Sequence, residues 1–173
     1  MHAADRGAES LEADVPFTQA DFNEPNFAVQ LGEGGFDLVV SIEVIEYVES
    51  PIGFLRNVGR LLKADGVAIL TTPNVDSLPA RIKFLLKGKI RTMDEAGEPT
   101  HISPIFWDLL CRQFLPVAGL ELVEHRAFPP HGFQLTRPGY ARVFRAAAHL
   151  FRGNSLAGDN HVLVLRKRRS NHA

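Results

Sequence analysis

Runs of consecutive hydrophobic residues alternate along the chain with segments in which hydrophobic residues recur every three or four positions. The runs over 36–42, 67–72 and 120–128 predict strands, and the first two are typical of strands buried on both faces. The periodic segments over 51–62 and 78–89 predict helices, and Ser103-Pro104 opens another. The first of these helices is expected to stop at Lys63-Ala64-Asp65-Gly66, on its glycine.

The remaining segments give weaker patterns. Residues 15–20 and 161–166 read as strands, 26–35 as a loop, and the alanine-rich stretch 3–13 as a possible helix. An amphipathic basic helix is predicted over 139–151, inside an insertion that spans 129–158 between the last two strands.

The order of these elements predicts an α/β fold. A strand, a helix and a second strand occupy about 35 residues from position 36, which is the size of a right-handed βαβ unit. We therefore expect a mostly parallel sheet with an antiparallel hairpin at its C-terminal edge. No linker divides the chain, so residues 1–173 are expected to form a single domain.

Composition narrows the class of protein. Hydrophobic residues make up 45% of the 173 residues and charged residues 23%, as in soluble globular domains. Basic and acidic residues number 19 and 20, a balance that argues against a nucleic-acid-binding domain. The first residues do not resemble a signal peptide, and we expect a cytoplasmic protein. The histidines show no metal-ligand spacing.

Several motifs follow one another in a fixed order. They are FDLVVSIEVIEYV at 36–48, the helix with its LLKADG end at 61–66, TTPN at 71–74, Asp21-Phe22, and His101-Ile102. Together, over about residues 17–165, they resemble the class I S-adenosylmethionine-dependent methyltransferases. The subgroup that they resemble most includes small-molecule O-methyltransferases and enzymes of polysaccharide or lipid-linked pathways.

The resemblance implies a cofactor, S-adenosylmethionine, and a set of site residues at the carboxyl ends of the strands, where such folds bind ligands. The resemblance implies that Asp21 and Phe22 bind the adenine end of the cofactor, and that Ser41, Ile42 and Glu43 also bind the cofactor. Each also has an ordinary structural reading, as a turn, core or solvated residue.

The same resemblance assigns residues to the acceptor side. His101 and Glu46 are the candidate catalytic residues, with His101 as general base because histidine titrates near neutral pH. Tyr47 and Asn74 are candidates for acceptor binding. Tyr47 stands where many relatives have histidine, and Asn74 could simply form a turn after proline.

One part of the family pattern is not found. The family opens with a strand and a glycine-rich loop, and its second strand ends in an acidic residue that binds the ribose. Neither is recognisable in this sequence, so the sheet is expected to lack its first two strands. The family strand order, third-second-first-fourth-fifth-seventh-sixth, then leaves the edge of the fourth strand open and the third strand detached.

This gap leaves three alternatives: a piece of a methyltransferase, a non-catalytic binding or partner subunit, or a chain completed by another protomer or protein. In each case we expect the isolated chain to bind S-adenosylmethionine more weakly than micromolar. The expected acceptor is a small or lipid-linked molecule. The basic helices at 78–89 and 139–151 could rest on a membrane surface, although packing on the sheet is the ordinary reading.

Overall fold

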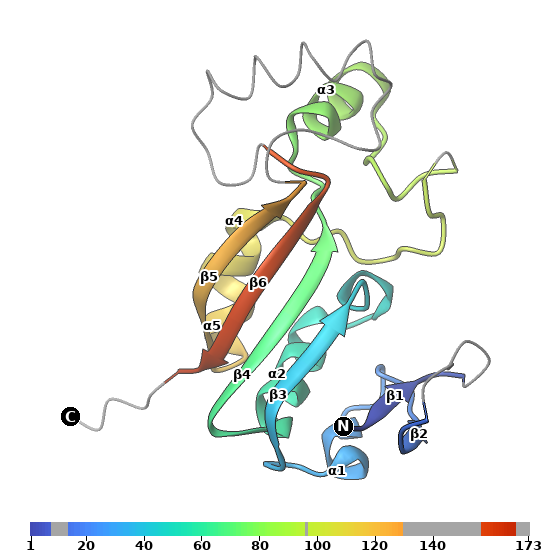
Figure 1. The fold of residues 1–173 in the computed structure, drawn as a ribbon. Helices are drawn as coiled ribbons and strands as arrows, with labels where there is room; N and C mark the ends of the chain where they lie inside the picture. Colours follow the sequence, from blue (N-terminus) through green and yellow to red (C-terminus); the bar gives the residue numbers. More distant parts are fainter. Residues whose placement is uncertain (8–13, 96, 130–156, 169–173) are drawn as a thin grey trace.

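The computed structural model describes residues 1–7, 14–95, 97–129 and 157–168, and it has the predicted α/β architecture (Figure 1). The main sheet contains four strands in the order β3-β4-β6-β5, which are β3 (Phe36–Ile42), β4 (Leu62–Pro73), β6 (Asn160–Lys167) and β5 (Leu120–Phe128). β3 and β4 are parallel, while β6 is antiparallel to both β4 and β5. Three strands therefore point the same way, and β6 and β5 form the predicted antiparallel hairpin.

Helix α2 (Pro51–Leu61) connects β3 to β4 and begins as predicted. Ser50 accepts a hydrogen bond at 3.2 Å from the backbone N–H of Gly53, and Pro51 occupies the first turn. The predicted end was wrong, because Leu62 already belongs to β4. Gly66 lies within this strand, where a Cβ atom would come within 2.8 Å of the Phe36 carbonyl oxygen. The glycine serves close packing against β3 rather than stopping a helix.

The helical layer lies on one face of the sheet (Figure 1). It comprises α2 and a second helical segment, α4 (Trp107–Leu109), η2 (Leu110–Phe114, a π-helical turn) and α5 (Leu115–Val117). This segment begins later than the predicted Ser103, whose hydroxyl donates a 2.6 Å hydrogen bond to the Val48 carbonyl in a non-helical stretch. Buried leucines from both layers, including Leu55, Leu70 and Leu163, form the core between them.

The N-terminal segment contradicts the helix expected over 3–13. Residues Ala3–Asp5 form a strand, β1, that pairs in parallel with β2 (Phe17–Gln19); residues 8–13 lie outside the described part of the chain. This two-stranded sheet is separate from the main sheet. The expectation that both first strands of the family pattern are missing was wrong in part, because β2, the third strand of that pattern, pairs with β1 and is not without a neighbour. β1 was not expected, because three residues are too few to show a hydrophobic period.

Three shorter elements complete the described chain. Helix α1 (Phe27–Leu31) replaces the loop expected over 26–35, because burial of Phe27 and Ala28 against α2 favours a turn of helix there. η1 (Ile45–Tyr47) follows β3, and α3 (Leu78–Lys87) ends at Gly88 in the left-handed conformation. The helix predicted over 139–151 and most of the 129–158 insertion lie outside the described residues. Among the described residues, none of the helices combines the length and the hydrophobicity that a membrane span requires.

The outer edge of β3 is unpaired in the described structure, as the strand order predicted. The sheet face opposite α2 is also bare along this strand, since no described helix covers it. Leu38, Val40 and Ile42 project from that face and are 52%, 52% and 65% exposed. An open strand edge beside apolar side chains is a surface on which another strand can pair.

Candidate functional site

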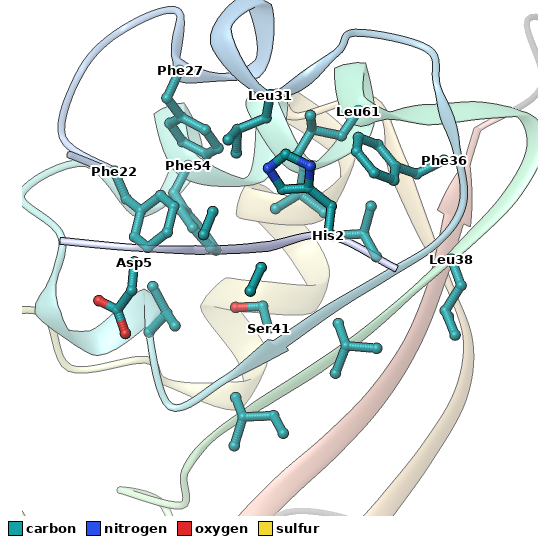
Figure 2. Close-up of a pocket in the computed structure, with 17 residues that line it drawn as sticks. His2, Asp5, Phe22, Phe27, Leu31, Phe36, Leu38, Ser41, Phe54 and Leu61 are labelled. Carbon is teal, nitrogen blue, oxygen red and sulfur yellow. The ribbon is translucent and has the colours of Figure 1, made fainter. Parts of the chain in front are cut away.

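A pocket of about 390 Å³ lies between β1 and the free edge of β3 (Figure 2). Its walls come from both strands, from the Phe22 loop and from helices α1 and α2. Most of the lining is apolar, and the oxygen-bearing side chains that reach it are those of Asp5 and Ser41. The pocket is therefore an apolar slot with three polar side chains, Asp5 and Ser41 near the carboxyl ends of their strands and His2 just before β1.

Asp5 is the residue of this pocket that sequence reasoning missed. It is the last residue of β1, and its carbonyl accepts a hydrogen bond from Ala20 just beyond β2. This strand takes the place beside β2 that the family pattern gives to the second strand, with an acidic residue at its end. The signal was there in the sequence as Ala-Ala-Asp, but only the pairing with β2 identifies it.

Three predicted cofactor residues line the pocket, namely Phe22, Ser41 and Ile42. The Phe22 ring packs edge-on against Phe27 at 5.2 Å between centroids. The Ser41 hydroxyl oxygen is buried and has no hydrogen-bond partner in the described structure. A buried hydroxyl without a partner is costly, which marks it as available to a bound polar group.

Asp21 and Glu43 do not line this pocket. The Asp21 side chain is exposed and accepts a hydrogen bond at 3.0 Å from the backbone N–H of Asn23, as in an ordinary Asx turn. Glu43 is turned toward the acceptor side, where its Oε1 accepts a 3.4 Å hydrogen bond from Asn160. Its backbone φ of 51° is rare for a residue with a side chain. Burial raises the pKa of the Glu43 carboxyl.

Glu46, which follows β3 on the acceptor side of the site, is buried, with 2% of its surface exposed. Thr72 of β4 donates a 3.2 Å hydrogen bond to its Oε2, while its Oε1 is buried with no hydrogen-bond partner among the described residues. Burial, together with the neighbouring charge of Glu43, raises the pKa of Glu46 to about 8. The carboxyl is therefore mainly protonated at neutral pH.

His101 lies beside this carboxyl, so the structure brings the two predicted catalytic residues together. Its Nε2 is 4.0 Å from the Glu46 Oε1, and its Nδ1 is 3.0 Å from the carbonyl oxygen of Thr92. The adjoining backbone is held by the Glu46 carbonyl, which accepts hydrogen bonds at 3.0 Å from Ile102 and Ser103. An imidazole is thus fixed next to a buried acid.

The two predicted acceptor residues have different surroundings. Tyr47 is 40% exposed and its ring meets that of His101 edge-on, with 4.5 Å between centroids. Asn74 is fully buried, and its side chain bonds to the backbone of Asp76, Ala157 and Gly158. Tyr47 is therefore open to solvent, whereas the Asn74 side chain is held in the framework that joins β4 to β6.

An open groove of about 530 Å³ leads to His101 from the surface beyond α3. Lys89, Ile90, Met93 and Ile102 lie along it. The site accordingly has two parts at the carboxyl ends of β3 and β4: an apolar pocket with Asp5 and Ser41, and a buried acid–imidazole pair with its own approach. Such an arrangement can hold one molecule in the pocket and remove a proton from a second.

A second buried titratable group sits near this pair. His161 of β6 is fully buried, and its Nδ1 is 2.9 Å from His125 Nε2. Burial and the neighbouring His125 lower the pKa of His161 to about 3. Glu46 and His161 should both make the stability of the fold depend on pH, with opposite signs.

We predict that Glu46→Gln abolishes a loss of stability at alkaline pH. Because the pKa of Glu46 is raised from its ordinary 4.5 to about 8, its contribution is complete below pH 4.5 and is lost as the pH rises to 8. His161 acts oppositely only below pH 6.5, so between pH 6.5 and 8 the effect of Glu46 is not offset by His161. There the free energy of unfolding should fall by about 1.4 kcal/mol per pH unit.

Urea titrations at successive pH values measure this slope. The Glu46→Gln protein keeps the hydrogen bond from Thr72 and should show no decline from pH 6.5 to 8. The same substitution at the exposed Glu49 should leave the decline in place. Parallel profiles for wild type and Glu46→Gln would show that the Glu46 pKa is not raised.

The chain matches the family model described as a methyltransferase domain, over residues 3–125. A ubiquinone biosynthesis O-methyltransferase of Ruegeria pomeroyi is 30% identical over 138 residues, which is 70% of this chain and 53% of that protein. A ubiquinone biosynthesis O-methyltransferase of Caulobacter vibrioides is 46% identical over 43 residues, which is 25% of this chain and 17% of that protein. The chain thus spans about half or less of these relatives.

Solved structures agree on the fold. A SAM-dependent methyltransferase from Archaeoglobus fulgidus superposes with a TM-score of 0.62 at 14% identity, covering 96% of this chain and 86% of the other. A second structure is the 1,6-didemethyltoxoflavin-N1-methyltransferase of Burkholderia thailandensis, solved with bound 1,6-didemethyltoxoflavin and S-adenosylhomocysteine. It superposes with a TM-score of 0.54 at 14% identity, covering 97% of this chain and 61% of the other. The match over residues 3–125 assigns the chain to the methyltransferase domain family, and its fold is that of the class I S-adenosylmethionine-dependent methyltransferases.

Proposed function

We propose that this chain carries out, as part of a completed domain, methyl transfer from S-adenosylmethionine to a hydroxyl group of a small or lipid-linked acceptor. The observation that carries the proposal is the pairing of His101 with the buried Glu46 beside the Asp5–Ser41 pocket. The family match and the O-methyltransferases among the relatives support it.

The pocket residues fit the cofactor. Ser41 offers a buried hydroxyl without a partner, Asp5 a carboxylate at a strand end, and Phe22 an aromatic face. In this proposal Asp5 accepts from the ribose hydroxyls, Phe22 and Ile42 pack on the adenine, and Ser41 bonds a polar edge. Asp21 and Glu43 lie at the margins of this arrangement. When bound, the cofactor supplies a methyl group on a positively charged sulfur.

The acceptor half provides the base. A hydroxyl that lay in the groove against His101 would give its proton to the His101 Nε2. The cofactor, held by Asp5, Phe22, Ser41 and Ile42, would supply the methyl group to the hydroxyl oxygen. The protonated Glu46 adds no negative charge of its own beside the attacking oxygen. Tyr47 contacts the acceptor on the solvent-exposed side of the site. Orientation in a water-poor cleft supplies the rest of the acceleration.

Cofactor binding tests the first half of the proposal. Calorimetry with S-adenosylmethionine should give a dissociation constant weaker than micromolar for the isolated chain, because one side of the pocket has no strand. Asp5→Asn should weaken this binding by at least about tenfold, since hydrogen bonds to a charged group contribute about 1.5–3 kcal/mol. Asp65→Asn, an exposed change on β4, is the matched control. Equal binding by both variants would refute the role of Asp5.

The acceptor class is tested with a panel of phenols that carry or lack a long alkyl tail. A lipid-linked acceptor is supported by the groove beyond α3 and by three neighbouring apolar side chains on that helix, Phe84, Leu85 and Leu86, which are 57%, 83% and 75% exposed. A tail that lies on this surface lowers the KM of the tailed phenol. If the tailed and untailed phenols have equal KM values, the acceptor is a small molecule without a tail. The apolar face of α3 then has no role in binding a lipid or a membrane.

The domain is completed, in this proposal, by a further strand between β1 and β3, from additional residues of the polypeptide, a second copy or another protein. Both strands turn an unpaired edge toward the same apolar pocket. This open slot also favours the alternative function, a non-catalytic partner subunit. Release of S-adenosylhomocysteine by the completed domain supports the enzyme, whereas association without any turnover supports the subunit.

We predict that Val40→Lys suppresses self-association of the chain. Val40 lies in the strand with the free edge, and a charge there opposes strand pairing. Sedimentation equilibrium should show association of the wild-type chain weakened about tenfold, or ~1.4 kcal/mol, in the variant. Val123→Lys alters an equally exposed valine on β5, the opposite edge, and should have no effect. If only the β5 variant dissociates, the contact lies at the other edge.

A further inference from the structure

The connection between α3 and His101 contains a strained backbone position. In the described chain, two residues other than glycine have a positive φ, and they are Glu43 and Thr92. Thr92 has a φ of 71°, in the left-handed region that a β-branched side chain strongly disfavours. Strain of this kind persists where the surroundings enforce it, and it is concentrated at functional sites.

Two neighbouring residues, Gly97 and Glu98, hold Thr92 in this conformation. Gly97 packs directly on Thr92, and a Cβ atom at position 97 would lie 2.7 Å from the Thr92 Cα and 2.9 Å from its carbonyl carbon. The Thr92 carbonyl accepts a hydrogen bond at 3.2 Å from the backbone N–H of Glu98. The turn therefore needs a residue without a side chain at 97, and it fixes the direction of the Thr92 carbonyl.

That carbonyl meets the imidazole of His101. Its oxygen lies 3.0 Å from Nδ1, and a carbonyl oxygen can only accept a hydrogen bond. Nδ1 must then carry the proton of the neutral ring, and Nε2 keeps its lone pair. Nε2 is also the nitrogen that faces Glu46, 4.0 Å from Oε1. The partner of one ring nitrogen thus decides which nitrogen can act as a base.

We infer that Thr92 is a positioning residue, whose strained carbonyl, held by Gly97, selects the Nδ1–H tautomer of His101 and so leaves the lone pair on Nε2, beside Glu46, free to act as the base. This inference rests on the proposed function for its catalytic consequence. The tautomer itself is a property of the chain alone and can be measured without turnover.

The test is nitrogen-15 NMR of histidine side chains in the full 173-residue chain. His101→Gln identifies the His101 signals by their disappearance. The wild-type ring should show a protonated Nδ1 and a bare Nε2 in its neutral form. A His101 ring with its proton on Nε2 would overturn the inference at once.

Two variants separate positioning from general stability. Gly97→Ala displaces the Thr92 carbonyl and should convert the His101 signals to a mixture of tautomers. Thr92→Gly relieves the strain but keeps the carbonyl, so it should preserve the tautomer and the thermal midpoint. Gly88→Ala, a glycine with open space around it and a φ of 64°, is the matched control and should leave the His101 signals unchanged. An unchanged tautomer in folded Gly97→Ala would overturn the inference.

Activity adds an independent readout. In the completed domain, Gly97→Ala should lower kcat at least tenfold with little change in the KM for cofactor, while Thr92→Gly should retain it. If the tautomer changes as expected but no variant, including wild type, transfers a methyl group, the positioning role stands and the proposed function fails. If wild type turns over and Gly97→Ala changes the tautomer without changing kcat, the positioning role in catalysis is excluded.

Discussion

Replacement of His101 by glutamine should reduce methyl transfer to a hydroxyl acceptor by about 10²–10⁴-fold, the usual contribution of a general base. Glutamine is close in size to histidine and its amide can still donate to the Thr92 carbonyl, which His101 contacts at 3.0 Å. It cannot take up the hydroxyl proton. The loss should therefore appear in kcat at saturating cofactor, measured as release of S-adenosylhomocysteine.

Two comparisons make this result decisive. His101→Ala should lose as much activity as His101→Gln, because both remove the base while only alanine also removes the packing. Tyr47→Phe keeps the edge-on contact with position 101 and should stay within a few-fold of wild type. If His101→Gln retains most of the activity, the imidazole acts by shape and the proton leaves by another route.

Replacement of Arg91 by methionine should lower the free energy of unfolding by about 3–5 kcal/mol, the usual effect of removing one partner of a buried ion pair. The Arg91 Nη2 lies 2.8 Å from the Asp159 Oδ1, and the two side chains are only 10% and 6% exposed. At this distance the two charged groups are in direct contact. Urea denaturation at neutral pH measures the change.

The double variant Arg91→Met, Asp159→Leu is the control. It removes both charges and should recover most of the lost stability, because an apolar pair needs no desolvation of ions. A loss below about 1 kcal/mol in the single variant, the range of exposed pairs, would show that the pair is solvated. Arg91 directly precedes Thr92, so the single variant should also disturb His101.

The main sheet could be predicted from the sequence because its strands carry long hydrophobic runs. β3 and β5 have the predicted bounds, and β6 extends the predicted strand by one residue at each end. The elements that were wrong depend on contacts made elsewhere in the chain. β1 is a strand only because β2 pairs with it. The sequence alone predicts that Gly66 ends a helix, and only its close approach to the Phe36 carbonyl shows that it lies in a strand.

The candidate site was partly predictable for the same reason. His101 and Glu46 were each named as catalytic candidates from the family resemblance, and the structure places their side chains 4.0 Å apart. Asp5 could not be found, since its role depends on the place of a three-residue strand. Asn74 had two interpretations, because a polar residue after a strand can face either a ligand or the turn that follows, and its side chain is buried against that turn. The assignments of single residues to cofactor or acceptor stay predictions.

The strand order has a consequence for the way this polypeptide acquires its structure during synthesis. The last strand, β6, lies between β4 and β5, so neither can complete its pairing until residues 160–167 have left the ribosome. Until then β5 has no partner among the described strands, and the hydrophobic run of β4 is paired only with β3. The nascent chain should therefore be most vulnerable to aggregation, and most dependent on chaperones, until β6 has emerged and paired with both neighbours.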